Sequence, residues 1–192
     1  ELLLGAKATA EENGYRREAV IADEYLGDVL LGRGQVDKAL FNYELGLEKS
    51  RSIASGNDLE GELLRRMGEA HMAAGRYQDA VAVSQAAIAV CEQCGEIYEL
   101  GFCHLTLARS YTGLQDRKQL TFHFQEAIGI FRDQELTRQW CEAILAFAEL
   151  RRENAAEEEL LTMRRHLMNA LEKGSSSLSD VIPCPLLDAL AR

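Results

Sequence analysis

The stretch Leu63–Ile88 reads LLRRMGEAHMAAGRYQDAVAVSQAAI and predicts a helix, a tight turn and a second helix. Gly75 marks the end of the first helix, because glycine is common just after a helix C-terminus. Gly68 leaves room where two helices approach closely. Ala80 lies five residues beyond Gly75, where the second helix must pack back against the first. The stretch therefore predicts a helical hairpin.

The same pattern returns along the chain at steps of 40 or 41 residues, which indicates a repeat architecture. Three kinds of position define the repeat. They are a large apolar residue before a small one, a small residue early in the second helix that becomes Leu in the third and fourth repeats, and an apolar residue near the end of the second helix. We therefore predict an all-α fold built from stacked helical hairpins. In chain order these positions are Leu26-Gly27, Met67-Gly68, Leu107-Ala108 and Phe147-Ala148; Ala39, Ala80, Leu120 and Leu160; and Leu47, Ile88, Ile128 and Met168.

The order of these residues resembles the tetratricopeptide repeat (TPR) pattern over about residues 15 to 172. The usual TPR period is about 34 residues, so steps of 40 and 41 imply roughly one extra turn in each helix. The fourth repeat is degenerate, with Arg151 and Arg164 at apolar positions. The resemblance implies a right-handed α-α superhelix, or solenoid, of TPR-like hairpins. Its best-preserved residues are Leu26-Gly27, Leu30, Gly34, Ala39, Tyr43 and Gly46-Leu47 in the first repeat, and Met67-Gly68, His71, Gly75, Tyr77, Ala80 and Ala87-Ile88 in the second.

Glycines and capping residues divide the chain into these repeats. We expect glycines at the helix ends and Asn57 and Asp116 as N-caps. The first helices should span 16–32, 59–74, 98–112 and 137–152, and the second helices 36–54, 77–94, 117–133 and 156–172. The expected boundary glycines are Gly34, Gly56, Gly75, Gly95 and Gly113. The predicted units are 1–14, the last helix of a truncated upstream repeat; 15–56, 57–95 and 96–134, three TPR-like repeats; 135–173, the degenerate fourth; and 174–192, a linker and a short C-terminal helix.

The composition is that of a soluble helical protein, with 47% hydrophobic and 27% charged residues among 192. A net charge of −10 argues against direct contact with nucleic acid and against anionic membranes. No apolar run reaches the length of about 18 residues that a membrane-spanning helix needs. The five cysteines are scattered and odd in number, so we expect a reducing, cytoplasmic location. The chain begins at Glu1 rather than Met, and we expect it to be a piece of a longer protein.

One group of residues offers metal-binding chemistry. Cys91 and Cys94 form a C-x-x-C pair, and Cys103 and His104 follow, which gives the four ligands of a structural zinc site. Neighbouring helical residues point about 100° apart, however, so Cys103 and His104 cannot easily face one ion. We interpret these side chains as core packing. No nucleotide-binding or catalytic motif is present in the sequence, so we expect no enzymatic activity, no metal and no cofactor.

The TPR resemblance implies that the first helix of each pair lines a concave groove. Chaperone-binding TPRs use Lys and Asn there to hold a terminal carboxylate. Glu24 and Asp28 stand in those places, which argues against such a ligand. A groove of alternating charge with apolar patches suits an extended or helical peptide of mixed charge. The groove positions implied by the resemblance are Glu24, Asp28 and Leu31; Arg65, Glu69 and Met72; Leu105, Arg109 and Thr112; and Leu145, Glu149 and Arg152.

We therefore predict a protein-interaction module that binds a peptide, a second subunit or another domain of its parent chain. The resemblance to long-period TPR arrays suggests a regulatory fragment of a large bacterial transcription regulator or signalling protein, with eukaryotic scaffold adaptors as a second comparison. One alternative is a structural scaffold that forms a homodimer. Another is a helical metal-dependent enzyme, which would need convergent ligands in one pocket. A last alternative use of the groove is occupancy by the chain's own C-terminal segment, around Leu186 to Leu190.

Overall fold

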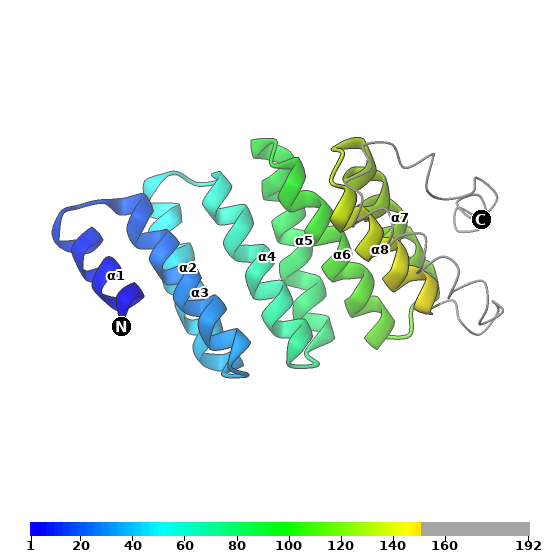
Figure 1. The fold of residues 1–192 in the computed structure, drawn as a ribbon, viewed down its shortest axis with the longest axis horizontal. Coiled ribbons are helices and arrows are strands. Elements are labelled where there is room, and N and C mark those ends of the chain that lie inside the picture. The colour runs from blue at the N-terminus through cyan, green and yellow to red at the C-terminus, as the bar shows by residue number, and fades with distance from the viewer. Residues whose placement is uncertain (151–192) are drawn as a thin grey trace.

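The computed structural model describes residues 1–150, which form eight helices arranged in a row (Figure 1). In chain order the helices are α1 (Leu2–Glu12), α2 (Arg16–Gly32), α3 (Val36–Ile53), α4 (Asp58–Ala73), α5 (Tyr77–Cys94), α6 (Ile97–Gly113), α7 (Arg117–Asp133) and α8 (Thr137–Leu150).

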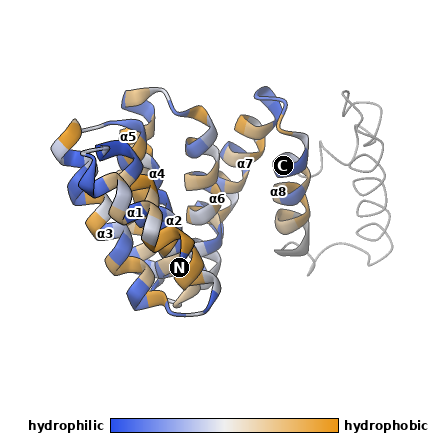
Figure 2. Cartoon of the chain, turned by 60° about the vertical axis from the view of Figure 1, so that its left-hand side comes forward, coloured by the Kyte–Doolittle hydropathy of each residue, from blue (hydrophilic) through white to orange (hydrophobic). Residues whose placement is uncertain are grey.

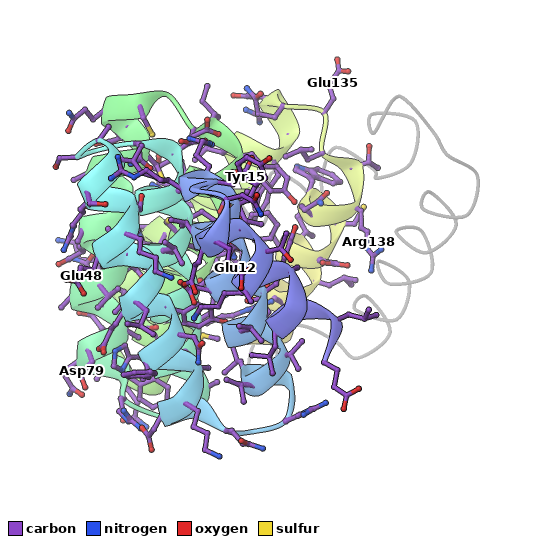
Figure 3. The ribbon with its side chains drawn as sticks, turned by 90° about the vertical axis from the view of Figure 1, so that its left-hand side faces the viewer. Glu12, Tyr15, Glu48, Asp79, Glu135 and Arg138 are labelled. Atoms are coloured by element: carbon purple, nitrogen blue, oxygen red, sulfur yellow. The ribbon has the colours of Figure 1, made fainter. Side chains whose placement is uncertain are left out.

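Successive helices pack as hairpins, α2 with α3, α4 with α5 and α6 with α7, and each hairpin stacks on the next. The first helices α2, α4 and α6 also contact one another in succession, so they form one continuous layer. Seen from the end that carries α1, Glu48 of α3 and Asp79 of α5 project from one side and Arg138 of α8 from the opposite side (Figure 3). The predicted all-α solenoid is confirmed for the described residues.

From α2 through α7, the helix bounds agree with the predicted ones to within one residue at each end. The second helix expected at 156–172 and the segment 174–192 lie outside the described residues.

Capping helps to explain why the helix starts were predictable, because a cap satisfies backbone N–H groups that the helix leaves unpaired. Asn57 Oδ1 accepts from the Glu60 N–H at 3.0 Å, and Asp116 Oδ1 accepts from the Gln119 N–H at 3.1 Å. Both predicted N-caps are confirmed.

The turns between helices use the left-handed backbone conformation, which glycine adopts at little cost. Gly34, Gly56, Gly75 and Gly95 all have φ between 71° and 80°. Gln115 takes this conformation in the third repeat, with φ of 60°. Gly113 lies at the predicted helix boundary, as the last residue of α6, but it does not adopt the left-handed conformation. A β-carbon on Gly113 would lie 2.4 Å from the Tyr77 ring, so the glycine makes room for packing.

The core consists of two buried clusters. The larger lies in the first two hairpins and reaches Cys103 of α6, and the other joins the α6–α7 hairpin to α8. Tyr43, Ser84 and Phe124 occupy the same place in successive repeats, and each is completely buried. Two large aromatic side chains of α8, Trp140 and Phe147, are buried in the same cluster as residues of α7. The fourth unit therefore also contributes to the core.

The helices carry both hydrophilic and hydrophobic residues along their length (Figure 2). Within residues 1–150, no helix combines the length and the apolar character that crossing a membrane requires.

Candidate functional site

The inner face, meaning the side of the array on which α2, α4 and α6 lie, holds most of the residues that the TPR resemblance implied. Their exposure differs widely, and several are too buried to touch a ligand directly. Arg109 is exposed, whereas Asp28, Leu31, Glu69, Met72, Thr112 and Leu145 are half-buried. Glu24, Arg65 and Leu105 are only 2%, 4% and 6% exposed. Arg152 and the side chain of Glu149 lie outside the described residues.

An ion-pair group joins α2 to α4 on the inner face. Arg66 Nε lies 3.2 Å from Glu24 Oε1, and Arg66 Nη2 lies 3.4 Å from Asp28 Oδ2. The Tyr43 hydroxyl donates to Asp28 Oδ1 at 2.7 Å. Glu24 and Asp28 therefore bind side chains of this chain.

A second ion-pair group joins α4 to α6. Arg65 Nη1 lies 2.8 Å from Glu69 Oε1, and Arg65 Nε donates to Glu99. The Arg65 guanidinium also lies 5.3 Å from the centre of the Phe102 ring, within the range of a cation–π interaction. Arg65 is therefore a structural link between two hairpins rather than a free charge on a groove wall.

Burial changes the ionisation of the inner carboxyl groups. Desolvation, followed by the neighbouring Glu62 carboxylate, raises the pKa of Glu24 to about 8, although Arg66 acts in the opposite direction. Desolvation likewise raises the pKa of Glu99, against the effect of Arg65. Because a buried charge is stable only when paired, these groups depend on their internal partners and are poorly placed to bind a ligand.

A stripe of side chains on α6 has a different character. Tyr98, Phe102, Leu105 and Arg109 follow one another at spacings of four, three and four residues, which places them on one side of the helix. Tyr98 is 44% exposed, and its ring centre lies 5.0 Å from that of Phe102. Arg109 is exposed and has no ion-pair partner among residues 1–150. This α6 stripe offers an aromatic surface and an unpaired cation.

The groove residues that the TPR resemblance implied do not include Arg66, Glu99, Tyr98 or Phe102. Tyr98 and Phe102 share the helical spacing of Leu105 and Arg109, so that spacing is a signal that points to them. No comparable sequence signal identifies Arg66 or Glu99, since each becomes significant through a partner on another helix.

A small pocket of about 200 Å³ lies where α1, α2 and α3 meet, beside Tyr15, Arg16 and Lys49. Its cations already have partners. Arg16 Nη2 donates to the Ser52 carbonyl at 2.7 Å, and Lys49 Nζ lies 2.7 Å from Glu11 Oε1. The pocket therefore has no free charge for a ligand.

The group considered for zinc does not converge. The Cys103 side chain belongs to the buried core cluster that contains Cys91, whereas His104 Nδ1 faces His123 Nδ1 at 3.0 Å. The expectation that Cys103 and His104 point to different neighbours is confirmed. In the part of the chain that the structure describes, no three His, Cys, Asp or Glu side chains are placed to hold a metal ion.

The His104–His123 pair should make the fold sensitive to acid. Desolvation lowers the pKa of both imidazoles to about 4, against 6.5 for the exposed side chain. The unfolded chain therefore binds more protons between pH 6.5 and 4, and the stability present above pH 6.5 is lost as the pH falls through this window. The raised pKa values of Glu24 and Glu99 act in the opposite sense, because there the folded chain binds the extra protons. We therefore expect the urea midpoint, followed by circular dichroism, to decrease from pH 7 to pH 4.5 relative to that of a chain without the two imidazoles.

The second repeat provides a matched control, because Leu64 and Val83 occupy the places of His104 and His123. The double variant His104→Leu/His123→Val should lack the loss of stability that the two imidazoles cause over the same window. An equally steep decline in that variant would assign the acid sensitivity to other groups.

The chain matches no protein-family model and no curated protein. Among solved structures, it is similar to BtubC (BKLC) from P. vanneervenii, with a TM-score of 0.71. The match covers 90% of this chain and 70% of that chain, at 15% sequence identity. At that identity the similarity shows the helical-repeat fold alone.

Proposed function

We propose that this chain is a TPR-type protein-interaction module that binds a segment of another protein along its inner face. The α6 stripe is the observation that carries this proposal. On α2 and α4, the inner-face charges Glu24, Asp28, Arg65 and Arg66 already have partners within the chain. Arg109, by contrast, is exposed without an ion-pair partner in residues 1–150, and Tyr98 exposes an aromatic ring on the same helix. Aromatic residues and arginine are enriched at the centres of protein interfaces.

The occupant that suits this face is an extended or helical peptide of mixed charge, from a separate protein, a second subunit or another domain of the parent chain. An acidic side chain of such a peptide would pair with Arg109, and its apolar side chains would pack on Tyr98. We further propose a regulatory role within a larger cytoplasmic signalling or transcription-regulating protein. The scattered cysteines of the sequence support that location.

The substitution Arg109→Glu tests the proposal. Ligands would first be selected from a displayed peptide library and from the remaining domains of the parent protein. We expect Arg109→Glu to weaken binding of the selected ligands by at least about tenfold, which corresponds to about 1.4 kcal/mol. Fluorescence anisotropy with labelled ligand would measure the change. Arg65 is unsuitable as a probe, because its reversal would disrupt the α4–α6 contact.

The matched control is Arg132→Glu, which makes the same change of charge at the exposed C-terminal end of α7. This variant should bind like the parent chain. Equal binding by both variants would move the site away from the α6 stripe. No selected ligand, together with a mass that increases with concentration, would favour the oligomerisation scaffold instead.

A further inference from the structure

The inner helices α2, α4 and α6 contain no side-chain amide. From Arg16 to Leu136, every asparagine and glutamine lies in α3, α5, α7 or a connecting turn. The hydroxyls of Ser110 and Thr112 donate back to carbonyl groups of α6, at 2.8 and 3.0 Å. The adjacent arginines of α4 bind carboxylates of this chain. The inner face of the three hairpins therefore has few groups left to pair with the backbone of a ligand.

This shortage restricts the conformation that a ligand can adopt. An extended peptide presents N–H and C=O groups that need partners once they are buried, and burying them unpaired is costly. A helical peptide pairs the same groups within itself. We propose that the inner face binds an amphipathic helix that lies along α6. This inference rests on the proposed binding function and narrows its ligand from an extended or helical peptide to a helical one.

The α6 stripe determines the side-chain pattern of that helix. Tyr98 and Arg109 are eleven residues apart, which is close to three full turns and about 16 Å along the axis. Between them Phe102 is half-buried and Leu105 is 6% exposed, so the surface that joins the two ends is apolar. A ligand helix has the same rise and turn as α6. Its matching side chains are therefore an acidic residue for Arg109, followed by apolar residues at spacings of four, three and four.

Helix dipoles favour one direction for the ligand. Tyr98 lies in the first turn of α6, and Arg109 lies in its C-terminal half. An antiparallel ligand places its own N-terminal turn beside Arg109. The dipole of a helix stabilises a carboxylate in its first turn, and the same carboxylate then pairs with the Arg109 guanidinium. The ligand is an amphipathic helix with an acidic residue in its first turn and an apolar residue eleven positions later.

A designed peptide tests the helical conformation. It consists of alanine and glutamine, with one glutamate in the first turn and leucines four, seven and eleven positions after it. Fluorescence anisotropy of the labelled peptide would measure its binding to the chain. We expect binding to weaken at least about tenfold when two central alanines that do not face the stripe are replaced by proline, because proline breaks a helix. Equal binding by the proline variant would overturn the proposal.

An exchange of charge tests the register. Arg109→Glu should weaken binding of the designed peptide at least about tenfold, and a peptide with lysine in place of its glutamate should restore it. Moving the glutamate by two positions turns it about 200° away from the leucines, so the moved peptide should lose as much affinity for the parent chain. Arg132→Glu is again the control and should bind the original peptide normally. Binding that does not depend on the position of the glutamate would overturn the register.

A peptide of reversed order tests the direction. In that peptide the leucines come first and the glutamate stands eleven positions after the first of them. We expect it to bind several times more weakly than the original, because its carboxylate lies near the unfavourable end of its own helix dipole. Tighter binding by the reversed peptide would overturn the antiparallel arrangement.

Peptides selected from the library separate this inference from the proposed function. Their circular dichroism should become more helical on binding, and proline within the contacting segment should abolish binding. Selected peptides that bind through Arg109 but stay non-helical and tolerate proline would leave the proposed function intact and overturn the helical ligand. Selected and designed peptides that are all insensitive to Arg109→Glu would overturn both.

Discussion

Replacing Arg65 with methionine should lower the free energy of unfolding by about 3–5 kcal/mol, because it leaves a buried carboxylate without its partner. Glu99 is 8% exposed and receives a hydrogen bond from Arg65. Methionine retains most of the arginine side-chain volume, so the loss of the charge dominates the effect. Urea denaturation followed by circular dichroism at pH 7 would measure it, and the midpoint should decrease without a change in slope.

The double variant Arg65→Met/Glu99→Met separates pairing from packing. Exchanging a buried ion pair for apolar side chains of similar volume is often neutral or stabilising, so the double variant should recover most of the loss. Arg138→Met is the matched surface control. Its partner Glu142 lies 2.9 Å away on the exposed side of α8, and we expect a change within about 0.5 kcal/mol. A loss as large in the double variant as in Arg65→Met would show that the stem of Arg65, rather than its charge, stabilises the joint.

The fold was predictable because local chemistry specifies a helical hairpin. Gly75 ends α4 in the left-handed conformation, and Asn57 caps its start, and both signals are visible without any tertiary information. The repeat at steps of 40 and 41 residues then places one hairpin on the next. Gly113 shows the limit of this reasoning, since its role comes from the Tyr77 ring of the preceding hairpin rather than from its own turn.

The candidate site was less predictable, because the sequence does not show which charges pair between helices. Arg65 and Arg66 are adjacent in α4, yet Arg66 binds Glu24 of α2 and Arg65 binds Glu99 of α6. Each partner lies more than 30 residues away along the chain, since the hydrogen bond from Arg65 to Glu99 spans 34 residues and that from Arg66 to Glu24 spans 42. Helical spacing predicts that such residues share a face. It does not predict that their charges are satisfied internally, which is the property that distinguishes Arg65 from Arg109.

Replacing Gly27 with alanine should lower the free energy of unfolding by about 2 kcal/mol, because overpacking a fixed core typically costs about 1–3 kcal/mol. The added β-carbon would lie 2.3 Å from Tyr43 Cε1. The ring has nowhere to move, since Tyr43 is completely buried and its hydroxyl donates to Asp28 Oδ1 at 2.7 Å. Thermal and urea denaturation would both detect the loss. Gly129→Ala is the matched control, because its β-carbon meets open space within α7 and alanine favours a helix by about 1 kcal/mol.

The third repeat indicates how the clash can be relieved. There Ala108 and Phe124 occupy the places of Gly27 and Tyr43, and Arg109 stands in the place of Asp28. At the equivalent positions of the third repeat, an aromatic ring that has no hydroxyl group is therefore buried together with an alanine, since Phe124 and Ala108 are both completely buried. We expect Gly27→Ala to cost less than half as much in a Tyr43→Phe background as in the parent chain. An equal cost in both backgrounds would mean that the surrounding core, and not the hydrogen bond to Asp28, fixes the ring against α2.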